Sequence, residues 1–118
     1  MATPRDLRLA LPPNSDGQMG NLLLTTSLLL TTSFQLRKVQ AGLEPDDWKP
    51  FDDVGAGVRE IRIRDAQGIY RVMFVANFEE AIYVLHCFKK KTEATSKHDK
   101  DIAVARYRSI VQHRKETK

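Results

Sequence analysis

Hydrophobic and polar residues alternate in the segment VREIRIR, Val58–Arg64. Its two isoleucines fall on one side of an extended chain, while Glu60, Arg62 and Arg64 fall on the other. A period of two predicts a half-buried β-strand with one apolar face and one charged face.

Two more segments have the composition of strands. Residues 69–76 (IYRVMFVA) are rich in β-branched and aromatic residues, and residues 81–88 (AIYVLHCF) are almost continuously apolar. Because a strand that is buried on both faces loses its alternation, we expect the latter to be the central strand. The short connections between the three segments predict an antiparallel meander.

Helical spacing appears at both ends of this meander. In the last segment, Ser96–Lys115, Ile102 and Ile110 fall on one face, and Ser96 with Asp99 forms a short capping box. Before the meander, we predict a helix from Asn21 to Ala41, ended by Gly42. The apolar spacing of this helix is clearest in its second half, at Leu36, Val39 and Leu43.

The first half of the predicted N-terminal helix contains a repeated hexapeptide, LLLTTSLLLTTS, at residues 22–33. Half of these residues are Thr or Ser, and a bilayer-spanning helix needs roughly 20 mostly apolar residues, so the run is not a membrane span. No apolar run in it exceeds three residues, which disfavours a secretion signal. A β-strand remains an alternative for the Thr-rich part.

The chain of 118 residues has the length of one compact domain. Pro and Gly punctuate residues 1–20, which predicts an irregular N-terminal arm with one helical turn around residues 5–10. Residues 21–118 are expected to form a single α+β domain. Trp48, in the polar turn segment EPDDWKP, is expected to close the edge of its core.

The charge is concentrated in the C-terminal quarter. Residues 89–118 hold ten Lys or Arg against four Asp or Glu, a net charge of +6, whereas residues 1–50 are neutral. A basic end beside a neutral body suits a polyanion such as RNA, although a solvated basic helix has the same composition. Cys87 is the only cysteine, so the chain forms no internal disulfide and a reducing, cytoplasmic location is expected.

Several cations are expected to converge in the folded meander. The outward face of the first strand would lie near Arg71 on the second and near the lysines that follow the third. Like charges repel, so such a cluster suggests that an anion compensates them. Arginine binds a phosphate with two parallel hydrogen bonds. We therefore expect an RNA backbone at Arg62, Arg64, Arg71 and Lys89–Lys91.

Four stretches between residues 35 and 112 carry a family resemblance: GLEPDDWKP, GVREIRIRDAQGIYRVMFV, YVLHCFKKKT and TSKHDKDIAVARYR. Together they resemble the phage-derived, HigB-like branch of the RelE toxin superfamily. The resemblance implies one or more N-terminal helices packed on a small curved antiparallel sheet, with a C-terminal helix. It also implies the toxin of a type II toxin–antitoxin pair. Such a toxin is an endoribonuclease that cuts messenger RNA, commonly on the ribosome, without metal or cofactor, and a protein antitoxin, often of the helix-turn-helix type, silences it.

The resemblance also assigns residues. Arg62, Arg71 and Lys90 fall at the positions expected to stabilise charge on the cleaved phosphate, and Arg64, Lys89 and Lys91 at positions that contact RNA. The acid and the base stay open among Glu60, His86 and His98. Many members of the superfamily use a Tyr or His near the C-terminus, but His98, Tyr107 and His113 match no family position. His86, on one strand face with Val84 and Phe88, suits a structural role as well as a chemical one, and Glu60 suits an exposed ion pair with Arg62.

Two other classes of protein remain open. A non-catalytic RNA- or ribosome-binding module would keep the same cations without the cutting chemistry. The interpretation as a secreted or membrane-associated protein is supported by the leucines of the hexapeptide repeat alone. Because six residues advance a helix by about 240° net, the hexapeptide repeat is not a neutral lengthening, which also leaves open a degraded, inactive toxin.

Overall fold

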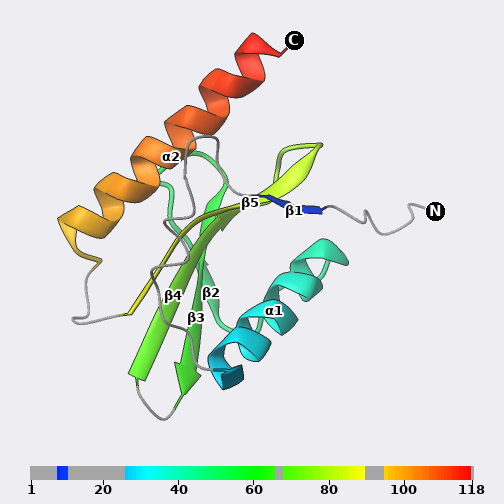
Figure 1. The fold of residues 1–118 in the computed structure, drawn as a ribbon, viewed down its shortest axis with the longest axis vertical. Coiled ribbons are helices and arrows are strands. Elements are labelled where there is room, and N and C mark those ends of the chain that lie inside the picture. The colour runs from blue at the N-terminus through cyan, green and yellow to red at the C-terminus, as the bar shows by residue number, and fades with distance from the viewer. Residues whose placement is uncertain (1–7, 11–25, 66–67, 90–94, 118) are drawn as a thin grey trace.

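The computed structural model describes residues 8–10, 26–65, 68–89 and 95–117. Within these ranges the chain forms one sheet flanked by two helices (Figure 1). The predicted α+β class, with a helix before the sheet and another after it, is confirmed. In chain order the elements are β1 (Arg8–Ala10), α1 (Thr26–Gln40), β2 (Trp48–Pro50), β3 (Val58–Asp65), β4 (Gly68–Val75), β5 (Ala81–Lys89) and α2 (Lys97–Glu116).

The strands lie in the order β1-β5-β4-β3-β2. β2 to β5 pair antiparallel, while β1 is parallel to β5. The three predicted strands are present as β3, β4 and β5. However, β4 rather than β5 is the central strand. The continuous apolar character of β5 reflects burial on both of its faces, which does not depend on a central position in the sheet.

Two short strands were not predicted. Residues 8–10 were expected in a helical turn but form β1, where Arg8 pairs with Ala81. β2 pairs with β3 and places Lys49 opposite Glu60. β2 ends at Pro50, which has no N–H for the ladder and is tolerated because β2 is an edge strand. The other residues of the predicted N-terminal arm lie outside the described ranges.

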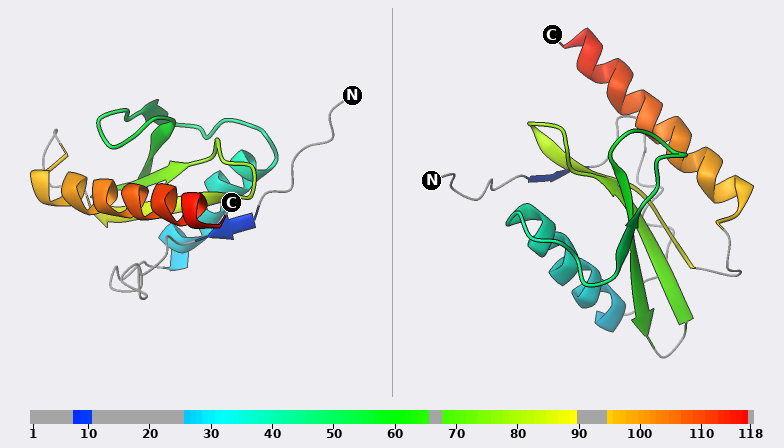
Figure 2. Two further views of the ribbon diagram at one scale, coloured as in Figure 1. Left: turned by 90° about the horizontal axis from the view of Figure 1, so that it is seen from above. Right: turned by 180° about the vertical axis from the view of Figure 1, so that it is seen from behind.

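The helices cover opposite faces of the sheet (Figure 2). Successive side chains of a strand point to opposite faces, and the two sets of buried residues alternate accordingly. Trp48 packs at the edge of the core beside α1, as expected. The α1-side core contains Leu36, Val39, Ile61, Ile63, Tyr70, Val72, Phe74, Ile82 and Val84, and the α2-side core contains Val54, Val58, Met73, Val75, Ala81, Tyr83, Leu85, Phe88, Ala103 and Ile110.

A β-bulge interrupts β5. Met73 of β4 pairs with His86, but the next residue, Phe74, pairs with Val84, so Leu85 is an extra residue in β5. The bulge sends Val84 to the α1-side core, while His86 contacts α2. The expectation that Val84 shares a face with His86 is therefore wrong, because the extra residue shifts the alternation.

The end of α1 follows the prediction. Gly42 has a φ of 81° just after the helix, and the Leu43 N–H donates to the Lys38 carbonyl at 2.8 Å, which closes the last turn. Leu43, however, is 61% exposed and does not extend the apolar face. The predicted start at Asn21 lies outside the described residues. From Thr26 onward the repeat is helical, which excludes a strand there.

Ser96 caps the N-terminus of α2, as predicted. The Asp99 N–H donates to Ser96 Oγ at 3.1 Å, and the Ser96 hydroxyl donates to Asp99 Oδ2 at 2.7 Å. This arrangement satisfies a backbone donor of the first turn and fixes the Asp99 carboxylate beside the sheet. Neither described helix is long and apolar enough to cross a membrane.

Candidate functional site

The charged residues predicted on β3 and β4 lie on the face of the sheet that α2 covers. Arg62 is directly opposite Arg71, with Glu60 and Arg64 two residues away along β3. Residues opposite one another in antiparallel strands point to the same face. Their depth differs: Arg64 is exposed, Arg62 is half-buried, and Arg71 and Glu60 are fully buried. The structure brings these four residues together but leaves only the two β3 arginines among them accessible.

Glu60 and Arg71 form a buried ion pair. Arg71 Nη1 lies 3.1 Å from Glu60 Oε1, and the two side chains are 1% and 0% exposed. Arg71 Nη1 also donates to Thr95 Oγ1 at 2.9 Å, and the Thr95 hydroxyl makes a longer contact of 3.4 Å to Glu60 Oε2. Thr95 immediately precedes the cap of α2. The pair therefore joins two neighbouring strands to the segment that leads into α2.

This ion pair differs from the one expected. Glu60 was expected to pair with Arg62 at the surface, but its partner is Arg71, in the interior. The reason is the register, which places Arg62 and Arg71 side by side with Glu60 one pleat away. The positive charge of Arg71 is thus compensated within the protein, without an external anion.

Arg62 and Arg64 are the two β3 cations that this face presents to solvent. Within the described ranges, neither guanidinium is ion-paired with a carboxylate. An arginine that is hydrated and uncompensated can exchange water for a phosphate, which it binds through two parallel N–H groups.

The lysines after β5 are placed differently. Lys89 pairs with Tyr70, whose side chain belongs to the α1-side core, and a Cβ at Gly68 would lie 2.9 Å from Lys89 Cε. Lys89 therefore lies over the end of β4 on the α1 side, and the structure does not bring it beside Arg62. Lys90 and Lys91 lie outside the described residues.

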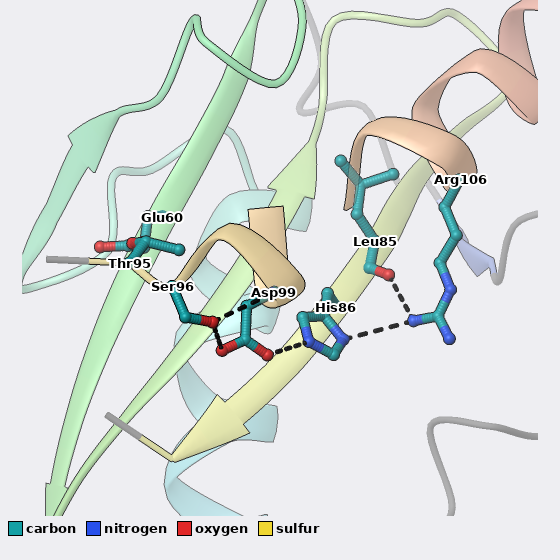
Figure 3. Close-up of polar contacts among 7 residues, drawn as sticks. All are labelled: Glu60, Leu85, His86, Thr95, Ser96, Asp99 and Arg106. Atoms are coloured by element: carbon teal, nitrogen blue, oxygen red, sulfur yellow. Dashed lines mark hydrogen bonds and ion pairs between the residues drawn. The ribbon is translucent and has the colours of Figure 1, made fainter. Parts of the chain in front are cut away.

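His86 connects β5 to α2 through both ring nitrogens (Figure 3). Nε2 lies 2.8 Å from Asp99 Oδ1, and Arg106 Nη1 lies 3.4 Å from Nδ1. A guanidinium only donates, so Nδ1 accepts and the hydrogen of the neutral imidazole is assigned to Nε2. Arg106 Nη1 also donates to the Leu85 carbonyl at 2.8 Å, at the bulge. Both nitrogens of His86 are thus used in holding α2 on the sheet.

Burial and charge shift the pKa of His86 and of its partner. Burial lowers the pKa of His86, and this effect, with the positive charges of Arg106 and His98, outweighs the stabilisation of the charged ring by Asp99. Burial raises the pKa of Asp99, but hydrogen bonds from Ser96 and His86 outweigh it and lower the pKa overall. The folded protein therefore favours a neutral His86 beside an ionised Asp99.

The shift at His86 predicts a pH dependence of stability. The unfolded chain takes up this proton near pH 6.5, above the pKa in the folded protein, so protonation favours unfolding. The stabilisation that depends on neutral His86 is fully present in the free energy of unfolding above about pH 6.5. It decreases as the pH falls through the lower folded-state pKa, by at most about 1.4 kcal/mol per pH unit. Urea unfolding between about pH 7.5 and 5 measures it.

Replacing His86 by glutamine is expected to flatten this dependence. The exposed His113 provides the matched control, since His113→Gln should leave the slope unchanged. An equally steep decline in His86→Gln and the parent would show that His86 is not its source. Asp99 does not interfere, because its pKa lies below the usual 3.8.

The remaining candidates occupy distinct environments. His98 is exposed in the first turn of α2. The Tyr107 hydroxyl donates to the Ala56 carbonyl at 3.0 Å, and its ring lies against Gly55. Burial raises the pKa of Cys87 to about 11, so Cys87 is a protonated thiol at neutral pH. Across the described ranges, no group of three or more His, Cys, Asp and Glu residues is placed to hold a metal ion.

Three residues of this charged site were not identified from the sequence. Lys49 lies with Nζ 3.9 Å from Glu60 Oε1, Thr95 bridges the buried pair, and Arg106 contacts His86. Lys49 and Thr95 reach Glu60 only through strand pairing and the return of the chain to α2. Helical spacing puts Arg106 on the buried face with Ala103 and Ile110, which is the one signal that could have identified it.

Comparison with known families assigns the chain to a family. The model of the family described as "Phage derived protein Gp49-like" matches residues 31–108, about two thirds of the chain. The chain belongs to this family. The Gp49-like family is a RelE/HigB-like family related to the toxins of toxin–antitoxin systems, which confirms the resemblance at the level of the superfamily. No curated protein matches the chain.

The Gp49-like match includes β2 to β5, most of α1 and the first part of α2. The Glu60–Arg71 pair, the two β3 arginines and the His86 contacts all lie inside it. Toxins of this kind are paired with antitoxins, so the Gp49-like family implies an antitoxin partner. Assignment to the HigB-like branch stays a prediction.

Proposed function

We propose that this Gp49-like protein is the toxin of a type II toxin–antitoxin pair that cuts messenger RNA without a metal ion. The observation that carries the proposal is the accessible pair Arg62 and Arg64 on the sheet face beside α2, in a chain of this family. Two arginines without a described carboxylate partner suit consecutive phosphates of an RNA strand. In this proposal the toxin acts in the cytoplasm, commonly on the ribosome, and a helix-turn-helix antitoxin silences it.

The proposed reaction is an internal transfer of the phosphate. The ribose 2′-oxygen attacks the adjacent phosphorus and loses its proton to a base, while the bond from phosphorus to the 5′-oxygen breaks and an acid protonates that oxygen. The products are a 2′,3′-cyclic phosphate and a 5′-hydroxyl. Cations near the non-bridging oxygens stabilise the charge that develops in the transition state.

The arginines take different roles in this proposal. Arg62, half-buried and facing solvent, contacts the phosphate that is cleaved, and Arg64 contacts a neighbouring one. Arg71 supports Arg62 from the interior, since Glu60 and Thr95 already engage its guanidinium. The predicted RNA contacts outside this face remain the three lysines Lys89, Lys90 and Lys91.

His98 is the acid or base that accessibility favours. A general acid or base must come within hydrogen-bond reach of the substrate. Glu60 is buried in its ion pair and His86 has both nitrogens engaged, whereas His98 is exposed at the start of α2. An imidazole can accept a proton at one ring nitrogen and donate one from the other, which is why histidine commonly serves as a general acid or base.

Substitution of Arg62 tests the proposal. Arg62→Ala is expected to reduce the cleavage rate by about 10²–10³-fold, the usual effect of removing one donor to a developing oxyanion. The measurements are growth after induced expression and mapping of transcript ends with cyclic-phosphate and 5′-hydroxyl termini. The control is Arg37→Ala, an exposed arginine on α1, which covers the opposite face. If folded Arg62→Ala cuts RNA as fast as Arg37→Ala, the assigned site is wrong.

The internal contacts of Glu60 and His86 favour a second candidate, the non-catalytic RNA- or ribosome-binding module, because they leave fewer groups for acid–base chemistry. The same experiment separates the two functions. Inhibited growth with unchanged transcript ends would identify the binding module. Unaffected growth and transcripts would exclude an active toxin and support a degraded copy.

A further inference from the structure

Lys49 adds a third accessible cation to the sheet face that carries Arg62 and Arg64, and it was not among the residues identified from the sequence. It lies on β2, directly opposite Glu60 on β3, and points to the same face as Arg62. Residues in this diagonal relation have Cα atoms about 7–8 Å apart, within reach of long side chains. The Lys49 side chain is 41% exposed, so its ammonium group is accessible at the edge of the sheet.

The Glu60 carboxylate attracts the Lys49 ammonium group to this position but does not engage all of its N–H donors. Lys49 Nζ is 3.9 Å from Glu60 Oε1, beyond hydrogen-bond distance, whereas Arg71 Nη1 is 3.1 Å from the same oxygen. Glu60 Oε1 is buried and receives no aligned hydrogen bond within the described part of the chain. One carboxylate thus faces two cations, and the more exposed of them keeps N–H donors for another acceptor.

A neighbouring lysine is engaged differently. Lys49 Nζ and Lys100 Nζ lie 5.6 Å and 5.9 Å from the centre of the Phe51 ring, so the ring keeps both ammonium groups at this edge. Lys100 is paired with the exposed Asp53 at 3.6 Å. The carboxylate near Lys49 is instead buried and shared with Arg71. Of the two lysines, Lys49 is the one that shares its carboxylate partner with a second cation.

We propose that Lys49 is a further RNA-binding residue that contacts the phosphate next to the one held by Arg62. This inference rests on the proposed function. It extends the RNA path from the exposed end of β3 across the sheet to the β2 edge. Glu60 positions the ammonium from below and is not itself in contact with RNA.

The test measures binding of a 2′-O-methylated RNA oligonucleotide, which lacks the attacking hydroxyl and so cannot be cut. Lys49→Met is expected to weaken binding and to reduce the slope of log affinity against log salt by about 0.7, the value for one phosphate contact on a single strand. Lys49→Arg should retain the slope. Lys115→Met, at an exposed lysine near the end of α2, makes the same change in net charge and serves as the control.

The fold should tolerate these substitutions, because Glu60 keeps Arg71 as its partner, and unchanged urea midpoints will verify this. If the parent binds and Lys49→Met has the same slope as Lys115→Met, the assignment of Lys49 is wrong and the proposed function stands. If the parent does not bind the oligonucleotide, the proposed RNA-binding function fails and the assignment fails with it.

Discussion

Replacement of Arg71 by alanine is expected to lower the free energy of unfolding by about 3–5 kcal/mol. The guanidinium and the Glu60 carboxylate are 1% and 0% exposed, so removing one leaves the other as an uncompensated charge in the interior. Thr95 loses its hydrogen-bond donor at the same time. Urea unfolding followed by circular dichroism measures the loss.

Two variants make this result specific. Arg64→Ala removes an exposed arginine from the same face and should change the free energy of unfolding by less than about 0.5 kcal/mol, as most surface substitutions do. Glu60→Leu with Arg71→Met replaces both charges by apolar groups and should cost less than Arg71→Ala alone. Equal losses in Arg71→Ala and Arg64→Ala would contradict the buried pair. A loss of toxicity in Arg71→Ala therefore reports on chemistry only if the variant is shown to be folded.

Phe74→Ala is expected to destabilise the protein by about 3–5 kcal/mol, through lost apolar burial and the cavity it leaves. Phe74 is 0% exposed, on the central strand, and belongs to the core against which α1 packs. Thermal or urea unfolding measures the effect.

Phe34 on α1 is the matched control, because the same substitution there removes a ring that is 58% exposed. Its one described aromatic interaction is with Lys38 Nζ, 5.2 Å from the ring centre. A cation–π contact at an exposed site contributes about 0.5–1 kcal/mol. Comparable losses for the two phenylalanines would mean that α1 does not pack on the sheet as described.

Local sequence patterns predicted most of the elements correctly. Alternation identified β3, apolar β-branched runs identified β4 and β5, and Ser96 with Asp99 marked the start of α2. These features depend on residues a few positions apart, which is the range over which backbone propensity and capping act. Local patterns did not identify residues 8–10 as a strand, because β1 forms only through pairing with β5, far away in the chain.

The candidate site was predictable in its composition but not in its pairing. The sequence placed Glu60, Arg62 and Arg64 on one strand face and expected Arg71 nearby, as the structure has it. It could not show that Arg71 is buried against Glu60, because that depends on the register of two strands and on Thr95. It also missed the bulge at Leu85, which turns His86 toward Asp99 and Arg106.

The α+β class, the order of the main elements, the charged face of β3 and the resemblance to the RelE-like toxins can all be read from the sequence alone. Which of these charges are neutralised inside the protein, and which face solvent, depends on the folded structure. Side-chain type and periodicity are local properties. The free energy of a charge depends on its burial and on the partners that distant segments supply.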